Sequence, residues 1–255
     1  MGKLFEKQTA IISGGIGDIG FATAVEFALQ GAHLALGGIN PESEATDFVS
    51  KIKDYGVQCT YQQVDVSDAK QVQDWITEVE QTIGTPDLII ANAAIVTLAG
   101  IHEITPEQWS RELRVNLDGA FYFTQFATVR LREKKLAGRV VFVGSWAGAT
   151  VHKHIPAYSV SKAGMNMLCK CMALELSPHN ILVNEIAPGY VSAGLSGRIW
   201  EENPGQFEQA LEKVPIKKIM TAKSVADQII YLCHPQNEHI TGMTLLMDGG
   251  LSLLS

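Results

Sequence analysis

The sequence contains few cysteines and no spacing that would use them together. Its four cysteines, Cys59, Cys169, Cys171 and Cys233, are scattered, with no CxxC pair and no histidine cluster at zinc spacing. Neither a disulfide framework nor a metal site is therefore expected. Reduced thiols are typical of the cytoplasm, which is where we expect the protein to be located.

Positive charge is also in short supply. Lys and Arg number 20 against 27 Asp and Glu, which gives a formal net charge of −7. Proteins that bind nucleic acid carry the opposite balance, so no nucleic-acid partner is expected. No uncharged stretch approaches the ~18 apolar residues of a membrane span, and the first residues lack the apolar core of a signal peptide. No membrane association is expected either.

The composition is that of a globular domain. Of the 255 residues, 46% are hydrophobic and 18% are charged, which separates the chain from disordered proteins. No Pro/Gly/Ser-rich linker, composition break or internal repeat divides it. The sequence predicts a single domain over residues 1–255.

Short apolar runs alternate with amphipathic helical stretches from end to end. The strand-like runs are 10–12, 34–36, 59–64, 88–90, 140–143, 181–186 and 243–247, and the helical stretches are 21–30, 43–55, 72–83, 106–135, 157–176 and 225–233. This alternation indicates βαβ units. We expect the α/β class, with a Rossmann-type doubly wound parallel sheet of about seven strands.

One long stretch, from Gly189 to about Thr221, shows no regular pattern and contains Gly194, Gly197 and Pro204. Loops of this length in compact domains are usually functional. We therefore interpret residues from about 190 to 221 as an irregular lid over a substrate.

A glycine-rich turn joins the first strand to the first helix. Gly15, Gly17 and Gly20 match GxGxxG, and glycines at such a turn allow a pyrophosphate to approach the backbone at a helix N-terminus. A turn without any ligand would share the pattern. The second strand ends at Gly38-Ile39-Asn40, without the arginine of NADP binders or the acidic residue of NAD binders. With Asp18 adding negative charge to the turn, the sequence weakly favours NAD.

Ser145, Tyr158 and Lys162 form a second pattern. Tyr158 and Lys162 are four positions apart, so they share one face if both are helical. A nearby ammonium lowers the pKa of a phenol, which makes it a better acid or base. Ser145 follows a strand at the carboxyl edge of the sheet, where ligands of such folds bind. Taken singly, these residues would be a packing tyrosine, a solvated lysine and a strand cap.

Together, Ser145, Tyr158-x-x-x-Lys162 and the loop from Gly14 to Gly20 resemble the short-chain dehydrogenase/reductase superfamily. The resemblance covers nearly the whole chain, which is similar to the 3-oxoacyl-[acyl-carrier-protein] reductase-like and the sugar or alcohol dehydrogenase members. It implies an enzyme that transfers a hydride between a nicotinamide cofactor and a carbonyl or secondary alcohol substrate.

The resemblance also implies site residues. The catalytic tetrad would be Asn116, Ser145, Tyr158 and Lys162, with Tyr158 as acid/base and Lys162 on the nicotinamide ribose. Besides Tyr158 and Lys162, the implied cofactor contacts are Gly14, Gly17, Asp18, Ile19, Gly20, Asp65, Val66, Asn92, Ala93, Ala94, Pro188, Gly189 and Val191. Asp18 stands where the family has glycine and Ala193 where it has threonine, and both departures concern cofactor binding.

The substrate end is less determined. We expect Ser145, Trp146, His152 and Tyr190 to contact the substrate, with Ile95, Val96, His154, Arg198 and Trp200 as further candidates. His152 and His154 would suit a polar or anionic substrate, although solvent-facing loop histidines are the commoner case. The apolar helix around Met165 and Met172 indicates a core or a subunit interface, and the family implies a homotetramer or a homodimer.

Two other functions share these features. A catalytically silent dinucleotide-binding scaffold or regulator would keep the fold and lose the chemistry, and the intact tetrad argues against it. A lyase or epimerase with a tightly bound cofactor is also compatible with the sequence.

Overall fold

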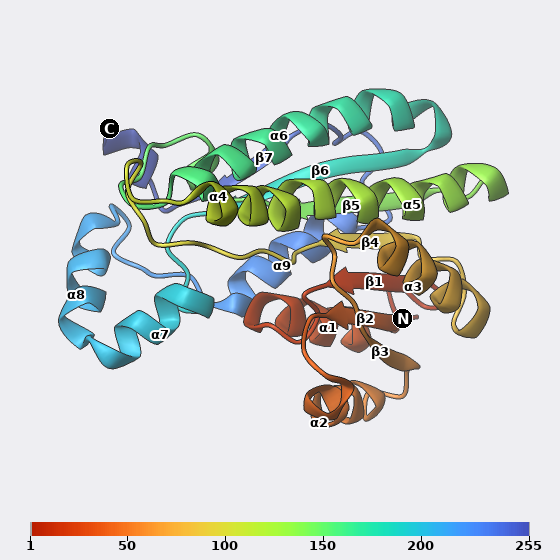
Figure 1. Cartoon of the computed structure of the whole chain (residues 1–255). Coiled ribbons are helices and arrows are strands. Elements are labelled where there is room, and N and C mark those ends of the chain that lie inside the picture. The colour runs from red at the N-terminus through yellow and green to blue at the C-terminus, as the bar shows by residue number, and fades with distance from the viewer. Residues whose placement is uncertain (1, 255) are drawn as a thin grey trace.

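The computed structural model describes residues 2–254, except for the side chains of residues 195, 198 and 199. Within this range, a parallel sheet lies between two layers of helices (Figure 1). Its seven strands are β1 (Thr9–Ser13), β2 (His33–Gly38), β3 (Cys59–Gln63), β4 (Leu88–Ala91), β5 (Gly138–Val143), β6 (Ile181–Pro188) and β7 (Thr244–Met247).

The strands are arranged in the order β3-β2-β1-β4-β5-β6-β7, and every neighbouring pair is parallel. The chain moves outward from β1 to β3, then returns to the other side of β1 with β4. Ligands of such sheets bind outside the carboxyl ends of the strands at this switch point. The predicted α/β class, parallel sheet and strand positions are confirmed.

Each face of the sheet carries its own core. Along β1, Ala10 and Ile12 pack into one core and Ile11 into the other, because successive side chains of a strand point to opposite faces. Both faces are covered, which is why the strands read as continuous apolar runs. The helices on the first face are α1 (Asp18–Leu29), α2 (Glu42–Lys53) and α9 (Ala222–Cys233), and those on the second are α3 (Ala69–Thr82), α5 (Gly119–Lys134) and α6 (Pro156–Leu176).

The predicted helix over 106–135 is a continuous helical segment with a wider turn in the middle. It starts as α4 (Pro106–Leu113), capped by Thr105 and Gln108, which bond each other's backbone N–H groups. A π-helical turn, η1 (Arg114–Asp118), then leads into α5. Such turns hold an extra residue and often mark functional sites.

The expectation of an irregular stretch from Gly189 to Thr221 is wrong. This segment contains two helices, α7 (Gly194–Glu202) and α8 (Pro204–Lys213), which lie beyond the carboxyl ends of the strands (Figure 1). Gly194 has a left-handed φ of 56° at the start of α7, and Pro204 occupies the first turn of α8, a position that suits proline. Of the residues that suggested a loop, Gly194 and Pro204 are therefore at helix boundaries, whereas Gly197 lies inside α7.

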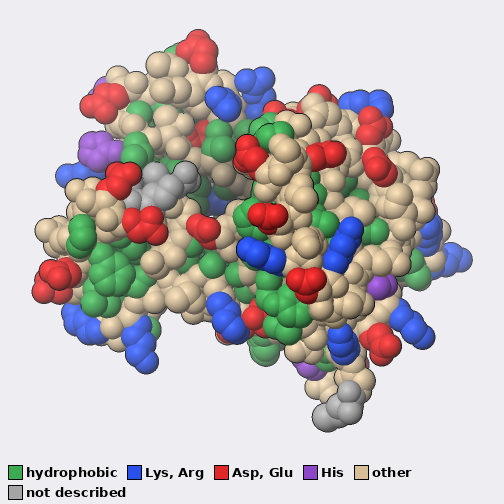
Figure 2. Space-filling view, turned by 90° about the horizontal axis from the view of Figure 1, so that it is seen from below, with side chains coloured by type: hydrophobic (Ala, Val, Ile, Leu, Met, Phe, Trp, Pro, Cys, Tyr) green, Lys and Arg blue, Asp and Glu red, His purple; other side chains and the backbone are tan. Residues whose placement is uncertain are grey.

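Among the described residues, no helix is long and apolar enough to cross a lipid bilayer. The face shown in Figure 2 carries acidic and basic side chains intermingled with apolar ones.

Short helical turns complete the chain: η2 (Trp146–Gly148), η3 (Ser177–His179) and η4 (Leu251–Leu254).

Candidate active site

Two adjoining cavities open at the carboxyl edge of the sheet. The reaction cleft, of about 720 Å³, is lined by residues that follow β4, β5 and β6, together with Tyr158 and Lys162 of α6. The outer cavity, also of about 720 Å³, is lined by the glycine turn and the ends of β2 and β3. Gly17 and Asn92 line both, so one extended ligand can occupy the two cavities together.

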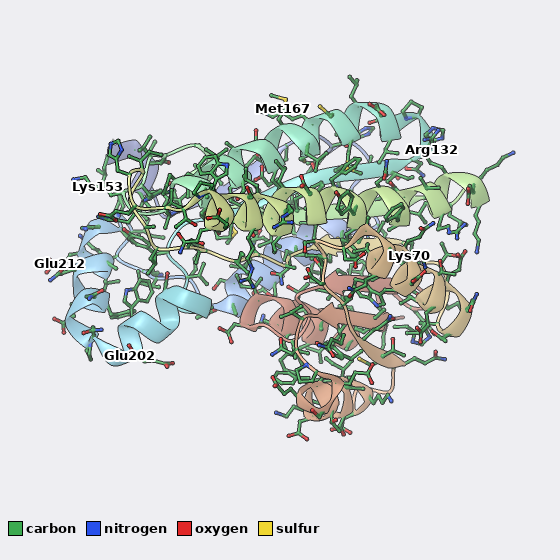
Figure 3. The ribbon with its side chains drawn as sticks, viewed as in Figure 1. Lys70, Arg132, Lys153, Met167, Glu202 and Glu212 are labelled. Atoms are coloured by element: carbon green, nitrogen blue, oxygen red, sulfur yellow. The ribbon has the colours of Figure 1, made fainter. Side chains whose placement is uncertain are left out.

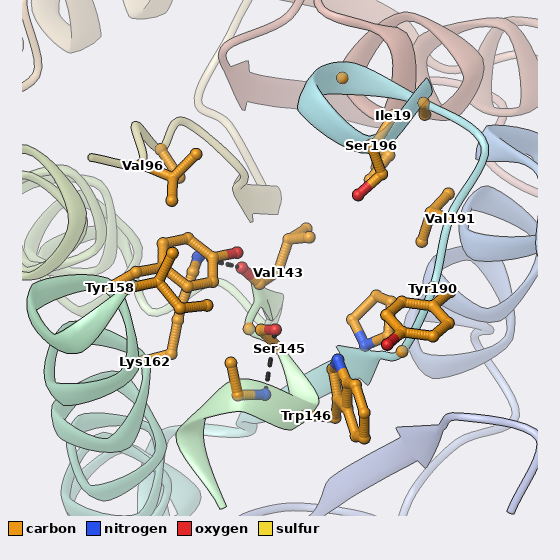
Figure 4. Close-up of a pocket in the computed structure, with 18 of the residues that line it drawn as sticks. Ile19, Val96, Val143, Ser145, Trp146, Tyr158, Lys162, Tyr190, Val191 and Ser196 are labelled. Atoms are coloured by element: carbon orange, nitrogen blue, oxygen red, sulfur yellow. Dashed lines mark hydrogen bonds between the residues drawn. The ribbon is translucent and has the colours of Figure 1, made fainter. Parts of the chain in front are cut away.

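Ser145, Tyr158 and Lys162 meet in the reaction cleft, as their spacing predicted (Figure 4). Helix α6 starts at Pro156, so Tyr158 and Lys162 lie one turn apart, and the Lys162 Nζ is 5.5 Å from the centroid of the Tyr158 ring. Lys162 is buried and donates a 2.7 Å hydrogen bond to the carbonyl oxygen of Val143, at the end of β5. The Ser145 Oγ accepts a 3.2 Å bond from the Ala147 N–H.

Burial controls the ionisation of both helix residues. It raises the pKa of Tyr158 above its ordinary value, while a hydrogen bond with Ser145 opposes this shift and the Glu112 carboxylate adds to it. Burial lowers the pKa of Lys162 to about 8, against the opposing effect of Glu185 and Glu112. The net shift of Tyr158 is therefore upward, opposite to what the Lys162 ammonium alone would cause. The phenol keeps its proton at neutral pH.

Asn116 lies in the π-helical turn η1 and is fully buried. Its side chain pairs with both backbone groups of Ile95, accepting from the N–H and donating to the carbonyl oxygen at 2.8 Å each. It also donates to the Ser161 Oγ of α6 at 3.1 Å. Asn116 thus connects the segment after β4 to the helix that carries Tyr158 and Lys162.

Glu112 was not singled out from the sequence. Its side chain is fully buried one turn before Asn116, and its Oε2 accepts a 3.0 Å bond from the Thr97 N–H. Its Oε1 is buried without a hydrogen-bond partner. Burial raises the pKa of Glu112, and Lys162 lowers it less strongly. A charged residue inside the apolar pattern of a helix was the only sequence signal for this position.

A second buried carboxylate, Glu185 of β6, lies beside Lys162. Its Oε2 accepts 2.7 Å bonds from the Asn166 Nδ2 and the Thr244 Oγ1. A Cβ added to Gly144 would lie 1.9 Å from the Glu185 Oε1. A side chain at position 144, immediately before Ser145, would therefore require the Glu185 carboxylate to move.

The glycine turn forms a cradle at the N-terminus of α1. Gly14 has a φ of +65°, and a Cβ on Gly20 would lie 2.2 Å from the Gly14 carbonyl oxygen. Asn92 joins the turn to β4 by donating to the Ser13 and Gly14 carbonyl oxygens at 3.1 and 3.0 Å. Gly17, the N-cap of α1, offers no side-chain cap to the first helical N–H groups, and Gly17, Asp18 and Ile19 line the reaction cleft. Such a cradle fits a pyrophosphate.

Asp18, the first residue of α1, lines the reaction cleft and contacts a second segment. Its Oδ2 accepts a 2.6 Å hydrogen bond from the Gly194 N–H at the start of α7. The residue that departs from the family glycine therefore connects the glycine turn to the α7 helix.

The remaining predicted cofactor residues line the cavities. Ile19, Pro188, Gly189 and Val191 line the reaction cleft, Asp65, Val66 and Ala93 line the outer cavity, and Ala94 lines both. Gly20 lies behind Gly14 rather than on the cavity surface. Arg111 and Arg114 also line the outer cavity, and the sequence analysis did not single them out.

On the substrate side, Trp146, His152, Tyr190, Ile95 and Val96 line the reaction cleft. His154, in contrast, is exposed with a left-handed φ of 66° and does not line it. Trp200 lies behind the cleft wall, with its ring centroid 6.0 Å from that of Tyr190. The side chain of Arg198 lies outside the described part of the chain.

Comparison with known proteins decides the family. Residues 15–252 match the sequence profile of a family described as enoyl-(acyl carrier protein) reductase. The chain belongs to the short-chain dehydrogenase/reductase superfamily. It is 31% identical to 2,3-dihydro-2,3-dihydroxybenzoate dehydrogenase of Bacillus subtilis, over 98% of both chains. It is 30% identical to 3-oxoacyl-[acyl-carrier-protein] reductase FabG of Thermotoga maritima, over 96% of this chain and 98% of that protein.

A solved structure of NAD+-bound xylitol dehydrogenase superimposes with a TM-score of 0.91 at 25% identity, covering 96% of this chain and 99% of that one. This short-chain dehydrogenase/reductase is therefore a nicotinamide-dependent oxidoreductase. The predicted family, fold and enzyme class are confirmed.

Proposed function

We propose that the enzyme prefers NAD and interconverts a small secondary alcohol and its ketone, with Tyr158 as the acid/base. The observation that carries the proposal is the position of the Tyr158 phenol, which hydrogen-bonds Ser145 beside the buried Lys162. These groups face a cleft that continues into the glycine cradle. A catalytically silent scaffold has no need to bury a lysine beside a tyrosine.

The cofactor supplies the hydride chemistry when it is bound. The N-terminus of α1 and the glycine turn would hold its pyrophosphate, Asp65 and Val66 its adenine, and Pro188, Gly189 and Val191 its nicotinamide. These residues fit the cofactor because Gly14 and Gly20 pack too closely for side chains. The turn therefore presents backbone rather than side chains to the pyrophosphate.

The chain's own residues then orient the substrate and move one proton. Ser145 and Tyr158 hold the substrate oxygen between them, and Tyr158, protonated at neutral pH, donates its proton to that oxygen during carbonyl reduction. In alcohol oxidation the proton moves the other way, which requires the deprotonated phenolate of Tyr158 and so a higher pH. Lys162 orients the ribose, and Asn116 keeps the segment after β4 packed against α6. A positioned acid/base contributes about 10²–10⁴-fold to the rate.

The preference for NAD is supported at the end of β2. Ile39 is 64% exposed there, and the Asn40 Nδ2 donates to the Glu44 Oε2 at 2.8 Å. The 2′-phosphate of NADP would lie near this carboxylate, and no cation on the same strand would offset the repulsion. The binding of NADP is therefore disfavoured relative to NAD. Arg111 and Arg114 lie on the wall contributed by α4 and η1.

Activity is tested with a panel of alcohols and ketones, read by nicotinamide absorbance with NAD(H) and NADP(H) in parallel. We expect turnover on at least one secondary alcohol and its ketone, with tighter binding of NADH than NADPH by calorimetry. Tighter NADPH binding that is lost in Arg114→Ala would show that the arginines, rather than the end of β2, set the cofactor preference. Absence of turnover with either cofactor would contradict the proposal.

We propose a homotetramer for the assembly, with a homodimer as the smaller alternative. Val160, Met167 and Leu174 of α6 are 48%, 58% and 80% exposed and recur at intervals of seven residues, so they form one apolar stripe. Met167 projects from the outer side of α6 in Figure 3. A cytoplasmic location is proposed because all four cysteines are free thiols, the form that a reducing compartment maintains.

A further inference from the structure

One wall of the reaction cleft is built of rings from separate segments. The Trp146 and His152 ring centroids lie 4.3 Å apart, and those of Trp146 and Tyr190 lie 5.4 Å apart, both edge to face. In Figure 4, Trp146 and Tyr190 lie across the cleft from Tyr158. Aromatic rings offer large, rigid contact surfaces, so this wall suits a substrate with an apolar face.

The His152 ring brings an unused polar atom to this wall. Its Nε2 is buried and has no hydrogen-bond partner among the described residues, although the ring lines the cleft. Burial lowers the pKa of His152 below its ordinary value, so the ring is neutral at pH 7. Buried polar atoms are normally hydrogen-bonded, and a hydroxyl group can both donate to and accept from a neutral imidazole.

Charge is scarce among the described residues that line the cleft. Apart from His152, the ionisable groups with a formal charge are Asp18 and Lys162. Asp18 bonds the Gly194 N–H, and Lys162 donates to Val143 beneath the reacting centre. The rest of the described wall is apolar at Val96, Leu98 and Ile155. This lining suits a neutral substrate better than a carboxylate or phosphate.

Building on the proposed function, we propose that the substrate is a neutral cyclic diol or its hydroxyketone, and that the His152 Nε2 hydrogen-bonds its second hydroxyl group. The first hydroxyl lies between Ser145 and Tyr158. In oxidation its proton passes to the Tyr158 phenolate, the hydride on its carbon would pass to the oxidised nicotinamide as the C–H bond breaks, and a ketone is released. The ring of the substrate lies against the side chains of Trp146 and Tyr190.

The test compares cyclohexanol, cis-cyclohexane-1,2-diol, cis-cyclohexane-1,3-diol and 2-hydroxycyclohexanecarboxylate on the wild type, His152→Phe and His152→Gln. We expect the wild type to favour one of the diols over cyclohexanol by tenfold or more in kcat/KM, since sites that hydrogen-bond a hydroxyl reject analogues without it. His152→Phe keeps a ring against Trp146 and should bring this ratio close to one, chiefly through KM. His152→Gln keeps a polar group and should retain part of the preference. The exposed His154→Phe serves as the matched control and should retain it fully.

The outcomes separate the two proposals. Equal efficiency on cyclohexanol and both diols in the wild type, or an unchanged preference in His152→Phe, would overturn the role of His152. Faster turnover of the carboxylate, or turnover of none of these cyclic compounds but of acyclic alcohols in the wider panel of alcohols and ketones, would overturn the substrate class while leaving the oxidoreductase function intact. Failure of every alcohol and ketone with both cofactors would instead overturn the proposed function.

Discussion

Tyr158 is the residue whose hydroxyl carries the proposed proton transfer. We expect Tyr158→Phe to lower kcat by about 10³-fold while the dissociation constant of NADH stays within about twofold, because the glycine turn and Lys162 remain. Turnover assays and fluorescence titration with NADH measure the two quantities. Tyr231→Phe, which removes the hydroxyl of an exposed tyrosine on α9, is the control. A Tyr158→Phe enzyme with wild-type kcat would refute the mechanism.

The charge of Glu112 should be visible in the pH profile. Its carboxylate raises the pKa of Tyr158 and of Lys162. Glu112→Gln keeps an oxygen that can accept from the Thr97 N–H and removes only the charge. We therefore expect the rise of kcat/KM with pH in alcohol oxidation to move to lower pH. Profiles measured between pH 5 and 10 test this.

Two further variants separate charge from structure at this position. Glu107→Gln, on the exposed face of the same helix α4, should leave the profile unchanged. Glu112→Val removes both the charge and the acceptor for Thr97, so it should lower thermal stability as well. If the Glu112→Gln and wild-type profiles superimpose, Glu112 only holds the Thr97 backbone in place.

At the scale of elements, the α7–α8 pair is the candidate lid. Trp200 of α7 contacts Tyr190 of the cleft wall and Phe207 of α8, with ring centroids 6.0 and 5.5 Å apart. The side chains of Leu195 and Ile199 of the same helix lie outside the described part of the chain. We expect amide hydrogen exchange over 192–214 to be rapid without ligands and slowed when cofactor and substrate are both bound.

Substitution of Asp18 tests the predicted mobility of residues 192–214. Because its carboxylate accepts from the Gly194 N–H, Asp18→Ala should speed exchange at the start of α7 in the ligand-free enzyme. Asp47→Ala, on the exposed side of α2, is the control. Slow exchange over 192–214 that ligands do not change would mean that α7 and α8 are a fixed structural element.

The sequence predicted the strands and the long helices better than the short helices α7 and α8. The strands and the long helices were recognisable because period-2 and period-3.6 patterns report burial. Helices α7 and α8 were missed because Gly194 and Pro204, which lie at helix boundaries, and Gly197, which lies inside α7, together indicate a loop in the sequence. Glu112 was missed because a charged residue on a helix normally faces solvent, and its burial follows from the packing of α4 against α6, which no local pattern encodes.

For the whole molecule, the apolar stripe on α6 predicts assembly. Light scattering should give the mass of four chains, or of two, each of 27.7 kDa. Leu174→Glu places a charge on the stripe and should shift the protein towards smaller species, since an unpaired buried charge is costly at an interface. Lys51→Glu, a charge change at an exposed position of α2 on the opposite face of the sheet, is the control. A monomeric wild type would contradict the proposed assembly.

The close approach of Gly144 to Glu185 has a consequence for how this enzyme can diverge. Alanine at position 144 alone would place its Cβ against the carboxylate, while loss of the carboxylate alone would leave Asn166 and Thr244 without their acceptor. A side chain at position 144 is harmful while Glu185 is present, and loss of Glu185 is harmful while Gly144 is present. The effect of a substitution at one position therefore depends on the residue at the other. In related sequences, a side chain at position 144 should therefore appear only where position 185 has already become smaller.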